Sequence, residues 1–331
     1  MKTAIIAAWR KGETDLDATI ASAVASVGEG VRVYAVEDVA MQGPGRTRDR
    51  GITAAIADGC DVGVIIDPHM RFKGDALATV AAHARETGRL CCPRCWHNAA
   101  CSWDVPGRYD GGRIVWKIED PKMSPRRSAL LFKWAASQRD PGPIGCVGGA
   151  CYGFPLAWYE AVGRPLAALP GWGGDEEALS ISAWLADAGP DLIEADVAHR
   201  YRAAAPWQLT DAESKAIRES RRVLIQAVVS DKADRMDALR WISADPHRLT
   251  AAGERWRAAL AEQPRTWEQW RQEVCEGYAT PVPPVRSAET PRGAMICRHG
   301  HCGGAMIERR RVGKWVHLQC ERCGRRRIEV G

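Results

Sequence analysis

Two side chains that can bind a metal follow one apolar segment near the N-terminus. Asp67-Pro68-His69 comes directly after the run VGVII at Val62–Ile66. An apolar run that ends abruptly at a carboxylate is typical of a buried strand. A carboxylate and an imidazole so spaced can hold a divalent cation, which acts as a Lewis acid toward a phosphate oxygen. A strand-end turn with solvated polar groups fits the same motif, so the motif alone leaves both interpretations open.

Four cysteines near the C-terminus form a second constellation. They make two pairs, each beside glycine, separated by a segment of hairpin length. Such thiolates match a tetrahedral zinc ribbon, although His299 or His301 could replace a thiolate of the first, longer pair. A short tail with few apolar residues needs a stabilising bound metal to fold. The alternative to a zinc site is four free cysteines at the surface. The predicted Zn²⁺ ligands are Cys297, Cys302, Cys320 and Cys323.

A third group of metal-capable side chains lies in the middle of the chain. It consists of Cys91, Cys92, Cys95, His97 and Cys101. The spacing permits a metal site, but the segment also continues a strand-like pattern in which cysteine packs as a small hydrophobe. We favour the second interpretation.

The N-terminal half must supply the elements that position Asp67 and His69. Apolar strand patterns alternate there with helical patterns, which predicts a Rossmann-like α/β fold with a mostly parallel sheet. Ligands of such sheets bind beyond the carboxyl ends of the strands, where Glu37-Asp38 and Asp67 fall. The predicted strands are Ala4–Ala8, Val31–Val36 and Val62–Ile66; the predicted helices start with a capping-box-like pattern at Thr14 and after the turn Gly43–Gly45.

The rest of the chain divides by composition. Apolar anchors at helical spacing predict helices over 211–279, and four prolines without apolar periodicity predict a linker over 280–293. We therefore expect an α/β catalytic domain at 1–210, a helical extension, the linker, and a basic zinc ribbon at 294–331.

Several segments in a fixed order carry a family resemblance. They are GPGRTRDRGI (Gly43–Ile52), Asp67-Pro68-His69, GCVGGACYGF (Gly145–Phe154), GWGGDEEALSISAWLADAG (Gly171–Gly189) and ADVAHRYR (Ala195–Arg202). Over roughly residues 3–210, the chain resembles GT-A glycosyltransferases of family 2, above all the catalytic domains of polypeptide N-acetylgalactosaminyltransferases. The resemblance implies an enzyme that moves a sugar from a UDP-sugar to a hydroxyl group.

The resemblance also implies residue roles. Asp67, His69 and His199 would ligate Mn²⁺ or Mg²⁺, while Asp38 and Arg48 would contact the uridine and its phosphates. The remaining residues would shape the sugar site: Gly148 and Gly149 through close backbone approach, Trp172 at the donor–acceptor junction, Asp175 and Glu176 as the catalytic carboxylates, and Arg202 in a segment that closes over the pyrophosphate.

The acidic segment departs from the family pattern. Asp175 stands where the family has a functional Glu, and Asp175-Glu176-Glu177 also fits the E-D-x-x-L of inverting enzymes, in which a carboxylate deprotonates the acceptor. Retention or inversion therefore stays open. Each residue alone also has a structural interpretation, such as first-turn acids of a helix or a structural His199.

Composition and charge indicate the cellular compartment of the protein and the part of the chain that is basic. No run of apolar residues approaches the ~20 that a membrane span requires. The apolar run at the N-terminus is too short for the hydrophobic region of a signal peptide. We expect a cytoplasmic protein whose twelve cysteines are reduced. The net charge is +5, yet residues 294–331 hold nine Lys or Arg and three Asp or Glu, a balance of +6, which leaves about −1 for the rest.

A basic tail on a nearly neutral body suggests a polyanionic partner. Trp315 and His317 lie among the tail's arginines, a pattern that suits a phosphate backbone and an unstacked base. The combination looks like bacteriophage glycosyltransferases, including TET-associated ones, which implies 5-hydroxymethylcytosine in DNA as the acceptor, in a host cytoplasm. The chain shows neither a membrane anchor nor lectin-like repeats, which disfavours a peptide acceptor in a secretory lumen. The alternatives are a polysaccharide or protein glycosyltransferase whose ribbon contacts a protein, and an inactive DNA-binding scaffold.

Overall fold

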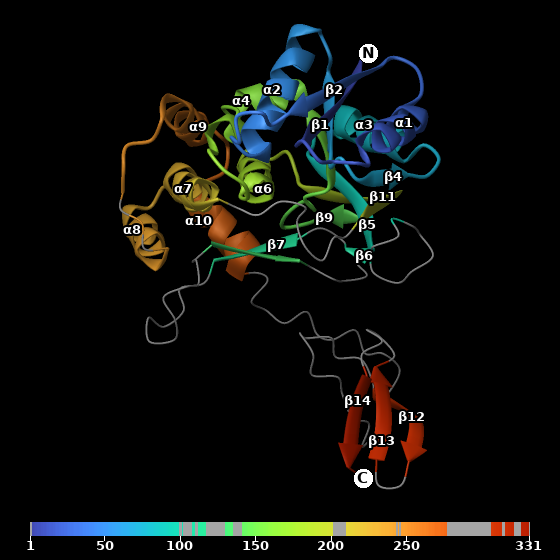
Figure 1. Cartoon of the computed structure of the whole chain (residues 1–331). Coiled ribbons are helices and arrows are strands. Elements are labelled where there is room, and N and C mark those ends of the chain that lie inside the picture. Colours follow the sequence, from blue (N-terminus) through green and yellow to red (C-terminus); the bar gives the residue numbers. More distant parts are fainter. Residues whose placement is uncertain are drawn as a thin grey trace. The chain divides into compact units, whose positions relative to one another are not determined.

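The computed structural model describes residues 2–98, 101, 108–109, 112–116, 130–134, 141–200, 210–242, 244, 246–276, 306–312, 315–320 and 326–330, some of them by their backbone alone. The chain divides into two compact units, Met1–Gly277 and Tyr278–Gly331. The first unit contains the α/β sheet and the helices that follow it, shown in Figure 1.

In the described part of the first unit, nine strands form one sheet, in the order β2-β1-β3-β10-β5-β11-β4, with β6 on β5 and β9 on β11. The strands are β1 (Thr3–Trp9), β2 (Val31–Glu37), β3 (Val62–Ile66), β4 (Met70–Phe72), β5 (Cys91–Asn98), β6 (Arg108–Tyr109), β9 (Gly142–Pro143), β10 (Cys151–Pro155) and β11 (Asp191–Arg200). All three predicted strands are confirmed, since β1 pairs in parallel with both β2 and β3.

The prediction of a mostly parallel sheet is wrong beyond those three strands. Strand β10 runs antiparallel to both β3 and β5, and β11 is parallel to β5 but antiparallel to β4. The α/β alternation ends after β3, because β4 follows it through a short turn instead of a crossover helix. The sheet is therefore mixed, and strands far apart in the sequence meet at its centre.

Helices cover both faces of this sheet (Figure 1). On one face α1 (Leu16–Val27) and α3 (Ala76–Thr87) enclose a core that includes Ile5, Val64 and Leu77. On the other lie α2 (Pro44–Ala57), α4 (Leu156–Ala161), α5 (Pro165–Ala168) and α6 (Asp175–Leu185). The expected capping-box start of the first helix is wrong, because its N-cap is Asp15 and makes no side-chain capping hydrogen bond.

The predicted helical segment forms α7 (Asp211–Val228), α8 (Lys232–Trp241), α9 (Ala251–Ala261), α10 (Trp267–Trp270) and a π-helical turn, η1 (Arg271–Glu276). Helix α7 starts with a capping box between Thr210 and Glu213. It packs on α6 and α9, within the same compact unit as the sheet. Of the apolar residues at helical spacing that predicted this segment, Leu224, Val228, Leu239, Trp256, Leu260, Trp267 and Trp270 are buried, and the side chain of Trp241 lies outside the described residues.

Two smaller sheets complete the described strands. In the first unit β7 (Gly112–Trp116) pairs with β8 (Leu130–Trp134), and in the second β12 (Met306–Val312), β13 (Trp315–Cys320) and β14 (Arg326–Val330) form an antiparallel sheet. Cys320 ends β13, described by its backbone alone; Cys297, Cys302, Cys323 and the linker at 280–293 lie outside the described residues. No helix in the described ranges is long and apolar enough to cross a bilayer.

Candidate functional site

The sheet brings the three predicted metal ligands together. Asp67 ends β3, His69 precedes β4, and His199 lies in β11, where the antiparallel β4–β11 pairing sets it beside Met70. The two imidazole rings lie 4.7 Å apart between centroids, and His199 Nε2 is 3.3 Å from Asp67 Oδ2. One ligand atom from each residue falls within 4.8 Å of the others. A carboxylate and two imidazoles at this spacing suit a divalent transition metal such as Mn²⁺.

Electrostatics keeps Asp67 ionised. Burial alone would raise its pKa, but the hydrogen bond with His199 and the charge of Arg48 outweigh burial and lower the pKa to about 2. Arg48 Nη2 donates to Asp67 Oδ1 over 2.7 Å. The Asp67 carboxylate is therefore available as an anionic ligand at any physiological pH.

Arg48 lies between the metal cluster and the first turn of α6. Its side chain is 6% exposed and reaches from α2 to three acceptors. Besides Asp67, the guanidinium donates to Tyr152 Oη (3.1 Å) and to Asp175 Oδ2 (2.9 Å). Arg48 thus joins the metal cluster to the first turn of α6, and its contact with the phosphates of a nucleotide stays a prediction.

The first turn of α6 contains carboxyl groups with perturbed acidity. Burial, together with repulsion from Asp175 and Glu177, raises the pKa of Glu176 to about 8. Burial also raises the pKa of Asp175 and brings that of Glu177 to about 7. A carboxylate with a pKa near neutrality is suited to accept a proton during catalysis. Because Asp175 is paired with Arg48, Glu176 is the better placed proton acceptor of the two predicted residues.

The predicted glycine pair lies against this acidic turn. An added Cβ on Gly149 would lie 2.2 Å from Glu176 Oε1, so only glycine leaves room for that carboxylate. The backbone N–H of Gly148 points to Cys92 Sγ at 3.4 Å. Trp172 lies just before α6 and is 52% exposed, so its ring is open to a ligand.

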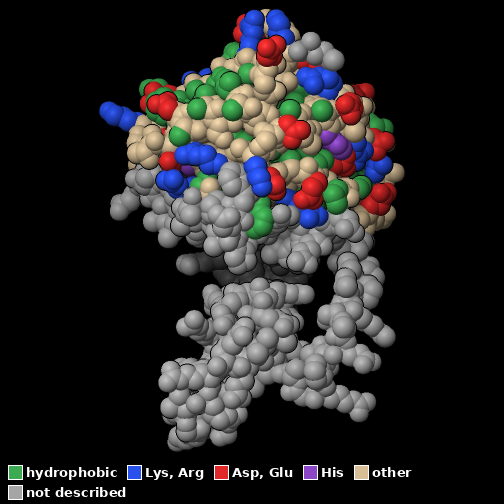
Figure 2. Space-filling view, turned by 90° about the vertical axis from the view of Figure 1, so that its right-hand side faces the viewer, with side chains coloured by type: hydrophobic (Ala, Val, Ile, Leu, Met, Phe, Trp, Pro, Cys, Tyr) green, Lys and Arg blue, Asp and Glu red, His purple; other side chains and the backbone are tan. Residues whose placement is uncertain are grey.

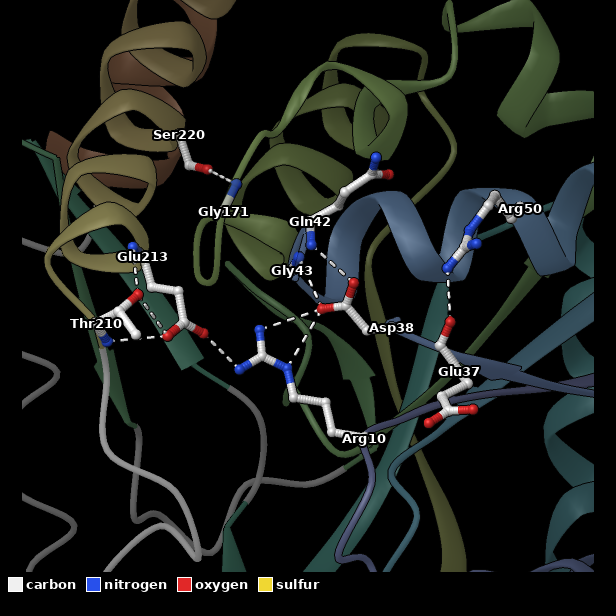
Figure 3. Close-up of polar contacts among 10 residues, drawn as sticks. All are labelled: Arg10, Glu37, Asp38, Gln42, Gly43, Arg50, Gly171, Thr210, Glu213 and Ser220. Carbon is white, nitrogen blue, oxygen red and sulfur yellow. Dashed lines mark hydrogen bonds and ion pairs between the residues drawn. The ribbon is translucent and has the colours of Figure 1, made fainter. Parts of the chain in front are cut away.

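Asp38 sits in a polar network at the ends of β1 and β2, drawn in Figure 3. Its Oδ2 accepts from Arg10 Nη2 (3.1 Å) and from the backbone N–H of Gly43 (2.9 Å), while Oδ1 accepts from the Gln42 N–H (2.7 Å). Arg10 Nη1 also pairs with Glu213 Oε1 of α7 at 2.5 Å. Most of the acceptor capacity of the Asp38 carboxylate is therefore used within the protein.

Helix α7 also approaches the loop before α6. Ser220 Oγ accepts from the Gly171 N–H over 2.9 Å (Figure 3). A Cβ on Gly171 would lie 2.4 Å from the backbone carbon of Ala216, and one on Gly43 would lie 2.5 Å from the Gly171 backbone. The backbone contacts of Gly171 with α7 on one side and with Gly43 on the other thus fix the segment that leads to Trp172.

Sequence reasoning missed three residues of this site: Arg10, Glu13 and Glu213. Arg10 and Glu13 follow the first strand, so the rule that ligands bind at the carboxyl ends of strands could have singled them out. No local signal marks Glu213 beyond its place in a capping box.

The other predicted residues fall into two groups. Arg202 lies outside the described residues, as does the side chain of His97. Cys91, Cys92 and Cys95 are buried in β5, and burial raises the pKa values of the Cys91 and Cys95 thiols. Neutral buried thiols agree with the interpretation of this segment as a packed strand. Among the described residues, only the cluster of Asp67, His69 and His199 groups three possible ligands.

The fold is similar to the GT-A fold of solved glycosyltransferase structures. No protein-family model and no curated protein matches the sequence. Among solved structures, the chain is similar to GalNAc-T7 crystallised with UDP, GalNAc and Mn²⁺, at 14% identity and a TM-score of 0.59, over 99% of this chain and 66% of that one. A weaker likeness is to S. aureus TarS in complex with UDP-GlcNAc, with 12% identity, a TM-score of 0.44 and coverage of 84% of this chain and 82% of that one. This chain spans about two-thirds of the length of the GalNAc-T7 structure.

Proposed function

We propose that this chain is a metal-dependent glycosyltransferase that uses a UDP-sugar donor. The cluster of Asp67, His69 and His199 beside the acidic turn of α6 carries the proposal. The structure of GalNAc-T7, which has the same fold, contains UDP and Mn²⁺. A divalent cation held by these three residues would neutralise charge on the departing UDP.

The chain's own residues supply the remaining steps. We assign Glu176, in its ionised form, as the group that takes the proton of the acceptor hydroxyl, because its carboxyl lies beside Gly149 whereas that of Asp175 is paired with Arg48. The acceptor oxygen then bonds to the anomeric carbon of the sugar while the bond from that carbon to UDP breaks. Gly149 keeps the space in which the Glu176 carboxylate sits, and Trp172 offers an exposed ring at the same loop. Asp38, Arg48, Gly148 and Arg202 stay assigned to donor binding.

For the acceptor, we propose 5-hydroxymethylcytosine in DNA. On the face of the first unit in Figure 2, acidic and basic side chains are intermingled. The positive charge of the chain gathers instead in residues 294–331, with a balance of +6. Charge so placed favours a polyanion through counterion release. A 5-hydroxymethyl group projects into the major groove, where an enzyme reaches it with less distortion than full base flipping requires.

The deciding experiment offers hydroxymethylated and unmodified DNA to the enzyme with several UDP-sugars and Mn²⁺. Masses of the digested nucleosides should show a sugar on 5-hydroxymethylcytosine and none on cytosine, and transfer should fall as salt rises. A peptide and a free glycan are offered in parallel. Transfer to either of these, with hydroxymethylated DNA untouched, would refute the DNA acceptor and leave the glycosyltransferase proposal standing.

A further inference from the structure

Two of the three predicted metal ligands are each held by a second, buried side chain. Glu13 Oε2 lies 3.2 Å from His69 Nδ1, and Arg48 Nη2 lies 2.7 Å from Asp67 Oδ1. The side chains of Glu13 and Arg48 are 1% and 6% exposed. Buried charge pairs of this kind hold their geometry better than exposed pairs, because water does not compete for either partner.

Each contact decides which atom of the ligand is left for a metal. Glu13 Oε2 occupies His69 Nδ1, so the ring nitrogen that is left for a metal is Nε2. Arg48 takes Asp67 Oδ1, which leaves Oδ2, the oxygen that lies 3.3 Å from His199 Nε2. Both contacts therefore leave one defined donor atom on each ligand.

Arg48 is itself fixed from two further elements. Tyr152 of β10 and Asp175 of α6 each accept from its Nη1, at 3.1 and 2.9 Å. A planar guanidinium with three partners cannot rotate freely, so the orientation of Asp67 is tied to the first turn of α6. Asp175 holds Arg48 from the side of α6.

We propose that Glu13 and Arg48 are positioning residues of the metal centre: they select and orient the donor atoms of His69 and Asp67. The inference rests on the proposed metal-dependent function. Residues that orient metal ligands in this way typically contribute about 10- to 100-fold to metal affinity. Loss of either contact should therefore weaken metal binding before any sugar nucleotide is present.

The test is a titration of the full-length protein with Mn²⁺ in the absence of a sugar donor. Binding is monitored by calorimetry and by electron paramagnetic resonance of the bound ion. The variants are Glu13→Ala, Glu13→Gln, Arg48→Met and Arg48→Lys. We expect about 10- to 100-fold weaker Mn²⁺ binding for Glu13→Ala and Arg48→Met. Glu13→Gln should lie between Glu13→Ala and the unaltered protein, because the amide oxygen can still accept from Nδ1.

Arg164→Lys is the matched control. Arg164 pairs with Asp49, the next residue of α2 after Arg48, at 2.9 Å, and Asp49 also accepts from Tyr159 Oη at 2.9 Å. This cluster repeats the Arg, Asp and Tyr chemistry of Arg48 without contacting a predicted metal ligand. Arg164→Lys should bind Mn²⁺ as the unaltered protein does.

The outcomes separate the two proposals. If the unaltered protein transfers sugar and binds Mn²⁺, and Glu13 and Arg48 variants bind it equally tightly, the positioning role is refuted and the proposed function stands. If the unaltered protein binds no Mn²⁺ yet transfers sugar with excess chelator, the metal-dependent function fails, and the positioning role with it. Thermal unfolding identifies any variant that fails to fold. In that case the Mn²⁺ affinities of Glu13→Gln and Arg48→Lys test the positioning role, since these changes keep a polar side chain of similar size.

Discussion

Arg10 Nη1 lies 2.5 Å from Glu213 Oε1, which joins the end of β1 to the first turn of α7 across 203 positions of sequence (Figure 3). Glu213 also accepts from the Thr210 N–H at 2.9 Å, and this hydrogen bond outweighs burial and lowers the pKa of the Glu213 carboxyl. The helical segment is thus bound to the same network that holds Asp38.

Glu213→Gln should loosen this junction. The change removes one charge of a pair whose side chains are 15% and 8% exposed, and leaves Arg10 with less compensation. We expect a loss of about 1–2 kcal/mol in the free energy of unfolding, below the cost of breaking a fully buried pair, together with a higher KM for the donor. Asp237→Asn, which breaks the exposed pair with Arg240, is the control and should cost at most ~0.5 kcal/mol. Equal losses in urea unfolding for both variants would contradict the prediction.

Asp67→Ala and His199→Ala should abolish transfer and leave the fold largely intact. Each removes a ligand from the cluster, so the charge on the departing UDP is no longer balanced. Chelation of the unaltered enzyme should have the same effect, and added Mn²⁺ should restore its activity. Full activity in excess chelator would rule out a metal-dependent reaction.

Alanine at two glycines should separate activity from stability. In Gly149→Ala the new Cβ meets Glu176 Oε1, the flexible end of a side chain, so we expect lost transfer with little change in melting temperature. In Gly171→Ala the Cβ meets the backbone of Ala216 in α7, which cannot move alone, so this variant should melt several degrees lower. The idea fails if Gly149→Ala keeps full activity or if Gly171→Ala melts as the unaltered protein does.

The raised pKa of Glu176 predicts a pH effect on the stability of the metal-free protein. In the unfolded chain this carboxyl loses its proton near its ordinary pKa of 4.5, but in the folded protein near 8. Between these values the folded state binds more protons, so stability falls as pH rises. Glu176→Gln should make this fall shallower. Chemical unfolding of both proteins between pH 5 and pH 8 is the measurement, and identical pH profiles would show that Glu176 titrates normally.

The C-terminal segment can be tested by cutting the chain within 280–292. The full chain should contain about one zinc, bound by Cys297, Cys302, Cys320 and Cys323, and the truncated chain none. Truncation should weaken DNA binding, because it removes a balance of +6, but should leave donor hydrolysis. If the truncated protein bound DNA as tightly as the full chain does, the proposed role of the C-terminal segment in DNA binding would be contradicted.

The sequence by itself determined the local elements and the residue types of the site. Short runs rich in apolar residues predicted β1, β2 and β3. Strand β3 and most of β1 are buried on both faces, so their runs are almost wholly apolar, whereas the edge strand β2 is half-buried and includes polar residues. The order of motifs likewise predicted the GT-A fold and singled out Asp67, His69 and His199, whose ligand atoms the structure brings within 4.8 Å. Each motif is a short contiguous segment, so its residue types can be recognised from the sequence alone.

Only the tertiary structure decided the direction of β10 and the partners of the charged side chains. Strand direction depends on which neighbours a segment finds in space, and β10 pairs with both β3 and β5. The same holds for Arg48, which reaches residues 19 and 127 positions away, and for the pair of Arg10 and Glu213. An ion pair forms between charges that lie close together in the folded chain. Sequence separation does not predict which charges those are.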